Sequence, residues 1–396
     1  MPHIRTDRLR LPPFPYAKGD VRFAWYAANV RHPDEGLLKV SVSGIPFFLQ
    51  IKPKGKTWLI KAEKITRPSP NALIKRALKS LVEATGMPLL YENISNLDEA
   101  KLTMPLECLK EVDRFDPEAL PDKPLWIEVG FGSGRHLLHQ AKAHPNVHLI
   151  GLEIHRPSLE QVMRRIDLEG LENVWVVDYD ARLFMELLPS DRVERIFVHF
   201  PVPWDKKPHR RIISEAFIDE AMRVLSPGGT LELRTDSENY FTYAMGLFLQ
   251  RTRLKLSLEK NLDGAVRSKY EDRWLRLGKN IYEVHASALE SSPPKRWNRR
   301  FAFRCAPDFD ALVARIPEKA RVAKDHFYHV ERLYRIENEA QLQGVVRVSF
   351  GSFDRPEHKY LLIGRDGVDY FPHAPVPTHA NRAAHEALEE WLCPTS

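Results

Sequence analysis

The sequence predicts an α/β protein: a central domain with a doubly wound parallel sheet, flanked by two smaller mixed or β-rich domains. Three observations support this fold class. Apolar strand-like runs alternate with amphipathic helix-like runs from residue 124 to residue 236. Shorter strand-like runs stand on both sides of this stretch. The length of 396 residues exceeds what one core usually organises, so two or three domains are expected.

The N-terminal part, residues 1–117, is expected to form a small α+β domain. Its strand-like runs are "LLKVSVSG", "PFFLQIKP" and "KTWLIKAEKI". Apolar residues at helical spacing then predict one amphipathic helix over residues 71–84.

The central part, residues 118–290, carries the alternating pattern. Its predicted strands lie in "LWIEVG", "VHLIGLEI", "VWVVD", "RIFVHF" and "TLELRTD". Helices are expected from Arg135, from Pro157, near Arg182 and from Ser214. Such alternation is typical of a parallel sheet with helices on both faces, and ligands bind such sheets at the carboxyl ends of the strands.

The proline-rich and basic segment "ESSPPKRWNRR" marks the boundary of a C-terminal β-rich domain, residues 300–396. Antiparallel strands are expected in "HFYHVERLYRI", "GVVRVSFGSF", "KYLLIG" and "VDYFP", with a turn at Asp366 and Gly367. A helix over residues 380–392 closes the chain.

The composition, 43% hydrophobic and 28% charged, is typical of a soluble globular protein. No run is long and apolar enough to cross a bilayer, and the N-terminus lacks a signal-peptide core, so a cytoplasmic location is expected. Cys108, Cys305 and Cys393 are far apart in the sequence and fit neither a disulfide framework nor a zinc site. A formal net charge of +6 is compatible with a polyanionic partner.

Three glycines, Gly130, Gly132 and Gly134, follow the first parallel strand in "LWIEVGFGSGRH". They predict a turn that a ligand can approach closely, although a tight turn without a ligand is the alternative. Glu153, about twenty residues further on, is placed to accept ribose hydroxyl hydrogens. Glu128 within the strand would repel a pyrophosphate but suits a sulfonium. S-adenosylmethionine therefore fits better than NAD.

Asp180 in "VVDYDAR" follows the third parallel strand. Its carboxylate is placed either to accept the adenine amino group of the cofactor or to cap a helix that begins at Ala181. The sequence leaves both interpretations open.

The segment "FVHFPVPWDKK" ends a predicted strand with two prolines, Pro201 and Pro203, which make the following loop stiff. Because this loop follows a parallel strand, it should lie beside the cofactor. Trp204 would then cover a flat base, or alternatively close the rim of the sheet as a core residue. A basic run follows, which indicates phosphate contacts or else a solvated face, and consists of Lys206, Lys207, His209, Arg210 and Arg211.

Five ordered motifs, "IEVGFGSG", "GLEIH", "FPVPWDKKPHRRI", "LRTD" and "SKYEDRW", resemble the bacterial tRNA (guanine-N7)-methyltransferases over about residues 120 to 290. The resemblance implies a class I S-adenosylmethionine-dependent methyltransferase with a Rossmann-like sheet. It implies tRNA as the partner, N7 of variable-loop guanosine 46 as the target, and no metal. The flanking domains lie outside this family core.

The resemblance also implies roles for single residues. It assigns Glu128, Glu153 and Asp180 to the cofactor, while the glycine turn itself adds Gly130 and Gly132 as predicted cofactor contacts. It also assigns Lys206 and Asp236 to the guanosine and Ser268 to Glu271 to the substrate side, while the basic run itself adds Arg210 and Arg211 as predicted substrate contacts. Without the resemblance, Asp236 would be a strand-end acid and residues 268–271 a surface loop.

One position departs from the family pattern, because Val202 stands where an acidic residue usually lies between the two prolines. Guanine N7 has a lone pair and no proton, so its methylation needs alignment and not a general base. Asp205 is the nearest carboxylate that could hold the guanine edge, and Asp236 is its rival, so both are predicted to be catalytic. Phe200 before Pro201 disfavours methylation of an exocyclic amine.

Two alternatives remain: an RNA methyltransferase with a different target atom, and a tRNA-binding protein without activity. The sequence does not decide between a monomer and a homodimer.

Overall fold

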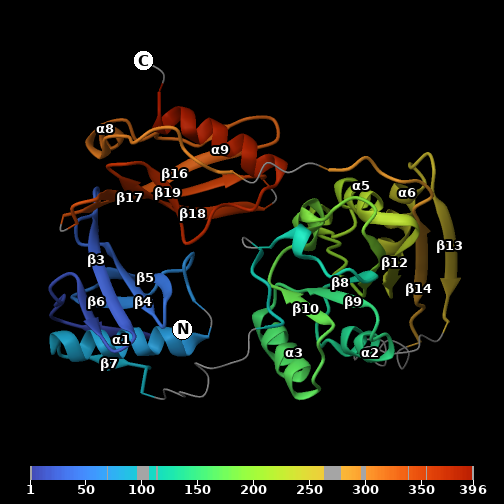
Figure 1. The fold of residues 1–396 in the computed structure, drawn as a ribbon, viewed down its shortest axis with the longest axis horizontal. Coiled ribbons are helices and arrows are strands. Elements are labelled where there is room, and N and C mark those ends of the chain that lie inside the picture. Colours follow the sequence, from blue (N-terminus) through green and yellow to red (C-terminus); the bar gives the residue numbers. More distant parts are fainter. Residues whose placement is uncertain are drawn as a thin grey trace. The chain divides into compact units, whose positions relative to one another are not determined.

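The computed structural model describes residues 2–68, 70–95, 107–112, 115–262, 278–295, 300–337, 339–353 and 355–394. The chain divides into a flanking unit, Met1–Met104 with Arg299–Ser396, and a central unit, Pro105–Asn298 (Figure 1). The sequence predicted separate N- and C-terminal domains, whereas the structure joins the two segments in one sheet. The joining pair is β3 (Val21–Asn29) and β16 (Phe327–Ile336), which are antiparallel. Backbone hydrogen bonds between segments far apart in sequence therefore build one unit.

The sheet of the flanking unit runs in the order β19-β18-β17-β16-β3-β4-β5-β6-β1-β7, with β2 paired to β3 and β15 to β16. Its N-terminal strands are β1 (His3–Thr6), β2 (Tyr16–Lys18), β4 (Gly36–Val42), β5 (Ile45–Lys54), β6 (Thr57–Ala62) and β7 (Tyr91–Glu92). Its C-terminal strands are β15 (Arg321–Val322), β17 (Leu342–Gly351), β18 (Pro356–Gly364) and β19 (Val368–Phe371). The strands expected in these segments are present, and five strands are additional: β1, β2, β3, β7 and β15.

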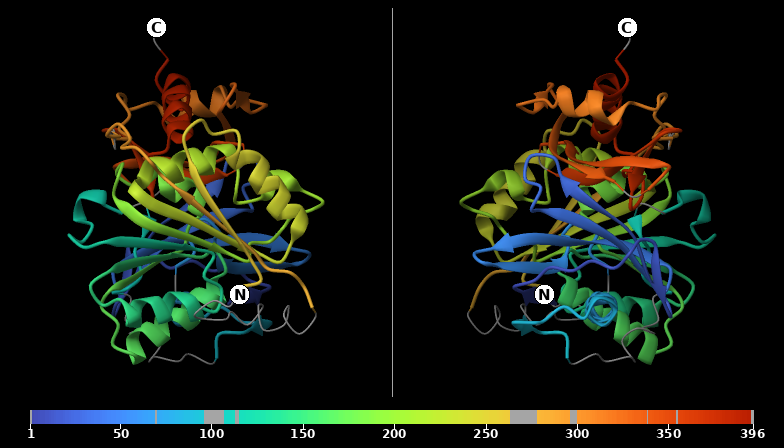
Figure 2. Two further views of the ribbon diagram at one scale, coloured as in Figure 1. Left: turned by 90° about the vertical axis from the view of Figure 1, so that its right-hand side faces the viewer. Right: turned by 90° about the vertical axis from the view of Figure 1, so that its left-hand side faces the viewer.

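Helices cover the two outer faces of this sheet. The helix α1 (Asn71–Thr85), whose position the sequence predicted, packs on the N-terminal strands. The helices α8 (Phe309–Ala314) and α9 (His379–Leu392) pack on the C-terminal strands. Figure 2 shows α1 and α9 on opposite sides of the strands.

A third core fills the inner face, between the N- and C-terminal halves of the sheet. The ring of Phe48 on β5 lies 5.0 Å from Tyr360 on β18 and 4.5 Å from Phe371 on β19, centroid to centroid. Trp25 on β3 lies 5.6 Å from the same ring. Since β5 and β18 are not neighbours in the sheet, the sheet must fold back on itself around these aromatic rings.

A disulfide links Cys305 and Cys393, whose Cα atoms are 5.8 Å apart. The wide spacing of the cysteines in the sequence predicted no disulfide, since 88 positions separate these two. The fold brings them together at the end of α9, and distance along the chain was therefore the wrong criterion. Cys108 is a free, half-buried thiol.

The central unit contains the predicted doubly wound sheet, in the order β10-β9-β8-β11-β12-β14-β13. The first five strands in this order are parallel, and they are β10 (Val174–Val177), β9 (His148–Leu152), β8 (Leu125–Val129), β11 (Val193–His199) and β12 (Leu225–Thr235). β14 (Tyr282–Ser287) is antiparallel to both β12 and β13 (Lys255–Lys260). Every residue of β8 is buried, which places this strand at the centre of the unit.

Four helices of the central unit, α2 to α5, begin within a residue of the predicted positions, and α6 was not predicted. Their bounds are α2 (Arg135–Ala143), α3 (Arg156–Leu168), α4 (Ala181–Phe184), α5 (Glu215–Val224) and α6 (Glu238–Phe248). Short 3-10 helices cover Pro117–Ala119, Met185–Leu187 and Pro208–Arg210. Ser214 caps α5 by accepting a hydrogen bond from the Phe217 amide at 3.3 Å.

Within the described ranges, every helix is too short or too polar to traverse a bilayer.

We predict that Phe48→Ala lowers the free energy of unfolding by about 3 to 5 kcal/mol, because its fully buried ring contacts both halves of the flanking sheet. Denaturant titration followed by circular dichroism measures this loss. Leu90→Ala, at a residue 57% exposed, is the control and should cost less than about 0.5 kcal/mol. Equal losses in the two variants would contradict a core between the halves.

Candidate active site

The candidate site lies where the five parallel strands of the central unit end. The chain runs from β8 through β9 to β10 on one side and then returns to β11 on the other side of β8. This change of direction is the topological switch point at which ligands bind in doubly wound sheets. The predicted site residues that the structure describes follow these strand ends, apart from Glu128, which lies within β8 next to its end.

Glu153, just after β9, holds the glycine turn (residues 130–134) in place. Its Oε2 accepts a hydrogen bond from the amide of Gly132 at 2.9 Å. Its Oε1 accepts from the amides of Ile154 at 2.8 Å and His155 at 2.9 Å. Gly132 has φ 52°, a left-handed conformation that favours glycine. The carboxylate thus ties the turn after β8 to the turn after β9.

Gly134 is required for the packing of two helices. A Cβ atom at this position would lie 2.4 Å from Cγ2 of Val162 on α3. Gly134 also has φ 69° and precedes the first residue of α2. The third glycine therefore lets α2 and α3 approach each other, and it is a packing requirement as much as a ligand signal.

Glu128 is nearly buried and has a partner that the sequence analysis missed. Its Oε2 lies 2.8 Å from Nδ1 of His136 on α2. The two side chains are 5% and 14% exposed. Burial by itself would lower the pKa of His136, but the adjacent Glu128 carboxylate raises it above its usual value. The sequence feature that could have indicated this pair is a histidine in the first turn of the helix that follows the glycine turn.

The polar contacts continue across the sheet. The ring of His136 lies 4.5 Å from that of His199, and Nε2 of His199 lies 2.7 Å from Oε1 of Glu232. Burial would raise the pKa of Glu232, but the hydrogen bond to His199 and nearby charge lower it. A buried chain of acids and imidazoles therefore extends from β8 to β12.

Asp180 caps α4, which was one of the two interpretations of this residue. Its Oδ1 accepts from the amide of Arg182 at 2.8 Å, and both carboxylate oxygens lie 3.2 Å from the Arg182 guanidinium. Asp178, which was not predicted, directly follows β10, and its charge interacts with that of Glu153. Its pKa is raised by burial, although Arg156 at 3.1 Å opposes the shift. The sequence feature that could have indicated Asp178 as a site residue is the first of the two acids in "VVDYD".

The proline-tryptophan loop (residues 200–205) has an unusual backbone. Phe200 has φ 49° and Trp204 has φ 46°, which costs a bulky side chain about 1 to 2 kcal/mol each. The side chain of Trp204 is 37% exposed, and the guanidinium of Arg210 lies 5.1 Å from its ring centroid. The interpretation of Trp204 as a core residue is therefore wrong. Val202 is 61% exposed.

Arg211 is buried and holds this loop. Its Nε donates to the carbonyl of Pro203 at 2.7 Å, its Nη2 lies 3.2 Å from Oδ1 of Asp205, and its guanidinium lies 4.5 Å from the ring of Tyr243. The sequence predicted that Arg211 contacts RNA, but a residue 4% exposed cannot reach a phosphate in this geometry. We reassign it to positioning the loop. The rest of the basic run, from Lys206 to Arg210, is exposed.

The two predicted catalytic acids differ in their surroundings. Oδ1 of Asp205 accepts from Arg211 and, at 2.7 Å, from Nδ2 of Asn239, so its orientation is set by the protein. Asp236 lies 2.7 Å from Nζ of Lys279, a side chain 42% exposed. The predicted substrate residues Ser268 and Glu271 lie outside the described residues.

Among the described residues, Glu232, Glu283 and His285 are close enough to share a cation, with ligand atoms within 4.8 Å of one another. Protein groups already neutralise them. Arg234 Nε lies 2.9 Å from Glu283, and His285 Nε2 lies 2.8 Å from the same carboxylate. The hydrogen bond to Glu283 raises the pKa of His285. This cluster therefore consists of ion pairs within the protein.

The strand order, the glycine turn after the first parallel strand and the acids at the following strand ends define a class I S-adenosylmethionine-dependent methyltransferase.

Comparison with known proteins specifies the family. The family model described as "Putative methyltransferase" matches residues 122–284. A tRNA (guanine-N(7)-)-methyltransferase of Wolinella succinogenes is 45% identical over 99% of this chain and 100% of its own length. Proteins of the same name are 36% identical in Campylobacter fetus, covering all of both chains, and 35% identical in Helicobacter hepaticus, covering 99% of each. The chain belongs to the tRNA (guanine-N(7)-)-methyltransferase family, and these relatives also match its flanking unit.

Among solved structures, a 16S rRNA (adenine(1408)-N(1))-methyltransferase mutant with cosubstrate SAM from Catenulisporales acidiphilia aligns over 46% of this chain and 95% of its own. The TM-score is 0.35 at 17% sequence identity, which adds nothing to the fold described above.

We predict that the destabilisation caused by His136→Gln depends on pH. Because the folded-state pKa of His136 is raised, its ion pair with Glu128 stabilises the fold fully below the unfolded pKa of about 6.5 and is lost as pH rises through the folded value. Denaturant titrations should show a larger loss at pH 6 than at pH 9. His209→Gln, at an exposed residue, is the control. A loss independent of pH would mean that His136 acts only by packing.

Proposed function

We propose that this chain transfers a methyl group from S-adenosylmethionine to N7 of a guanine in tRNA, the reaction for which its relatives are named. The observation that carries the proposal is the proline-tryptophan loop at the end of β11. It offers an exposed aromatic ring with a guanidinium over it, and an apolar Phe200 precedes Pro201. Such a loop can hold a flat base but has no acceptor at Phe200 for a proton from an exocyclic amine.

The residues at the strand ends fit S-adenosylmethionine, whose sulfonium would supply an activated methyl group. Buried Glu128 supplies negative charge that favours a cationic cofactor. Oε1 of Glu153 already accepts two amide hydrogen bonds, whereas Oε2 accepts one and keeps a lone pair for a ribose hydroxyl. Asp180, or Asp178 beside it, would accept the adenine amino group.

On the substrate side, the protein has to align the base and accept the charge that it gains. We infer that Trp204 stacks on the guanine, and base–aromatic stacking contributes about 1 to 3 kcal/mol. Lys206 and Arg210 would contact phosphates, and Asp236 or Asp205 would accept hydrogen bonds from the guanine edge. No proton has to be removed from N7, so the exposed Val202 does not preclude the reaction, and no metal is needed.

We further propose that the target is variable-loop guanosine 46, in the cytoplasm. We expect the purified chain to transfer labelled methyl from S-adenosylmethionine to a tRNA transcript, and nuclease digestion with mass spectrometry to place 7-methylguanosine at position 46. A transcript with adenine at that position is the control. Methyl at another atom would favour the alternative RNA methyltransferase, and tight tRNA binding without any transfer would favour the non-catalytic alternative.

We predict that Asp236→Asn lowers the single-turnover rate at saturating cofactor by roughly a hundred- to a thousandfold, the loss expected for one oriented acceptor or donor in a transition state. Asp205→Asn should lower it less, because Oδ1 of Asp205 already accepts hydrogen bonds from Arg211 and Asn239. Asp122→Asn, an exposed acid before β8, is the matched control. The reverse order of the two losses would assign the guanine edge to Asp205.

A further inference from the structure

The net positive charge of the chain lies in the flanking unit and not in the unit that carries the methyltransferase site. The flanking unit has 31 Lys and Arg against 23 Asp and Glu, whereas the central unit has 28 against 30. The excess is confined to residues 1–104, with 17 basic against 9 acidic side chains. A search for a polyanion-binding surface therefore starts with the N-terminal half of the flanking sheet.

Strand register brings basic residues of this half onto one face. Lys52 on β5 lies opposite Leu59 on β6, and Leu59 lies opposite Arg5 on β1. Lys61 on β6 belongs to the same face, because directly opposed residues share a face and side chains alternate along a strand. Lys54, opposite Thr57, extends the row. The helix α1 covers the other face, with Leu49, Ile51 and Ile60 in its core.

We call Arg5, Lys52, Lys54 and Lys61 the inner basic face. Among the described residues, no carboxylate lies within 4.0 Å of their charged nitrogens, and Arg5 Nη2 donates to the Thr57 hydroxyl at 3.1 Å. Partial burial and then the charge of Lys52 lower the pKa of Lys61. The neighbouring acid Glu63 is 2% exposed and is bound by Arg347 at 3.5 Å. The four cations of this face therefore form no direct ion pair within the described part of the chain, although the charge of Glu63 partly opposes the lowering of the Lys61 pKa.

An aromatic pair lies beside these cations. Tyr91 on β7 is directly opposite Arg5 and so shares its face. Its side chain is 47% exposed, and its ring stacks on that of His3 with centroids 5.0 Å apart. Exposed rings beside unpaired cations are typical of surfaces that track a nucleic-acid backbone and stack its bases.

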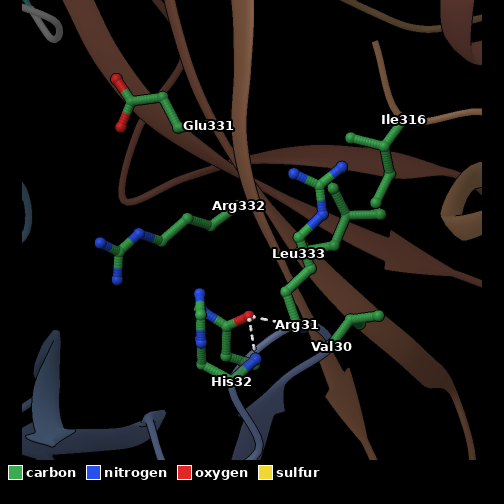
Figure 3. A pocket seen from close by; sticks show the side chains of 8 residues that line it. Val30, Arg31, His32, Ile316, Glu331, Arg332 and Leu333 are labelled. Carbon is green, nitrogen blue, oxygen red and sulfur yellow. Dashed lines mark hydrogen bonds between the residues drawn. The ribbon is translucent and has the colours of Figure 1, made fainter. Parts of the chain in front are cut away.

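A second group of basic residues in this unit is largely paired with carboxylates. A pocket of about 130 Å³ lies beside Arg31, His32 and Arg332 (Figure 3). Arg332 is paired with Glu35 at 2.5 Å, and Glu331 at the same pocket binds Arg347 and His358. Because most of these charges are already neutralised within the protein, the inner basic face is the stronger candidate.

We propose that the inner basic face, with Tyr91, is a second tRNA-binding surface that contacts the sugar-phosphate backbone of the substrate. The proposal rests on the proposed function, because that function supplies the polyanion. It gives the flanking unit a role in holding the substrate, separate from the residues that align the guanine.

The test compares Lys52→Ala/Lys61→Ala with Lys75→Ala/Lys79→Ala, which removes the same charge from α1 on the outer face. Fluorescence anisotropy with labelled tRNA over a range of salt gives the slope of log affinity against log salt. The inner pair should flatten this slope by roughly 0.7 to 0.9 per lost phosphate contact, and the control should leave it unchanged. Tyr91→Ala should lower affinity without changing the slope. Cofactor affinity should stay at the wild-type value in all three variants.

If Lys52→Ala/Lys61→Ala keeps the wild-type salt dependence, the proposal is wrong. The inner basic face is then a solvated surface or a protein-binding surface. Lys54→Glu, at an exposed strand end, provides the same measurement if the double variant does not fold. Assays of 7-methylguanosine formation separate the two proposals. Methylation by the wild type with an unchanged slope refutes only the second surface, whereas a flattened slope without methylation refutes only the proposed function.

Discussion

The pairing of β8 with a parallel strand on each side is the constraint on which the candidate site depends. Because β9 and β11 run in the same direction as β8, their carboxyl ends meet at one edge, and the chain must leave that edge through loops. Glu153 joins two of these loops by accepting three amide hydrogen bonds. Its carboxylate thus orders backbone amides that lie beyond the strands and have no partner in the sheet. Glu128, within β8 itself, is held at the same edge by His136 on the following helix.

The substrate side depends on a different kind of interaction, a buried cation. A guanidinium withdrawn from water is costly unless it is paired and hydrogen-bonded. Arg211 meets this requirement with the carbonyl of Pro203, the carboxylate of Asp205 and two tyrosine rings. The same contacts hold a loop in which Phe200 and Trp204 keep unfavourable backbone angles. A strained loop that its surroundings hold firmly is suited to placing an aromatic ring against a substrate.

In the flanking unit, two sequence segments share one sheet, but only one of them carries the excess of basic residues. The shared sheet is folded around Phe48, so neither segment has its whole core alone. The N-terminal segment carries the basic excess, and α1 covers one face of its strands, so that Lys52 and Lys61 remain on the other. A substrate as large as tRNA can contact more surface than the methyl-transfer site offers, and a separate basic face would add affinity without altering the chemistry.

The sequence by itself determined the type of most elements and the order of the site, because local periodicity and turn residues report backbone conformation directly. It located α1, the parallel strands, the glycine turn and the start of α5 at Ser214. Only the tertiary structure decided which distant segments meet: β3 with β16, Cys305 with Cys393, and His136 with Glu128. It also decided that Arg211 is buried while Trp204 is exposed, since a basic run and a tryptophan look the same in sequence whichever way their side chains face. Pairing and burial depend on packing between segments that no local pattern encodes.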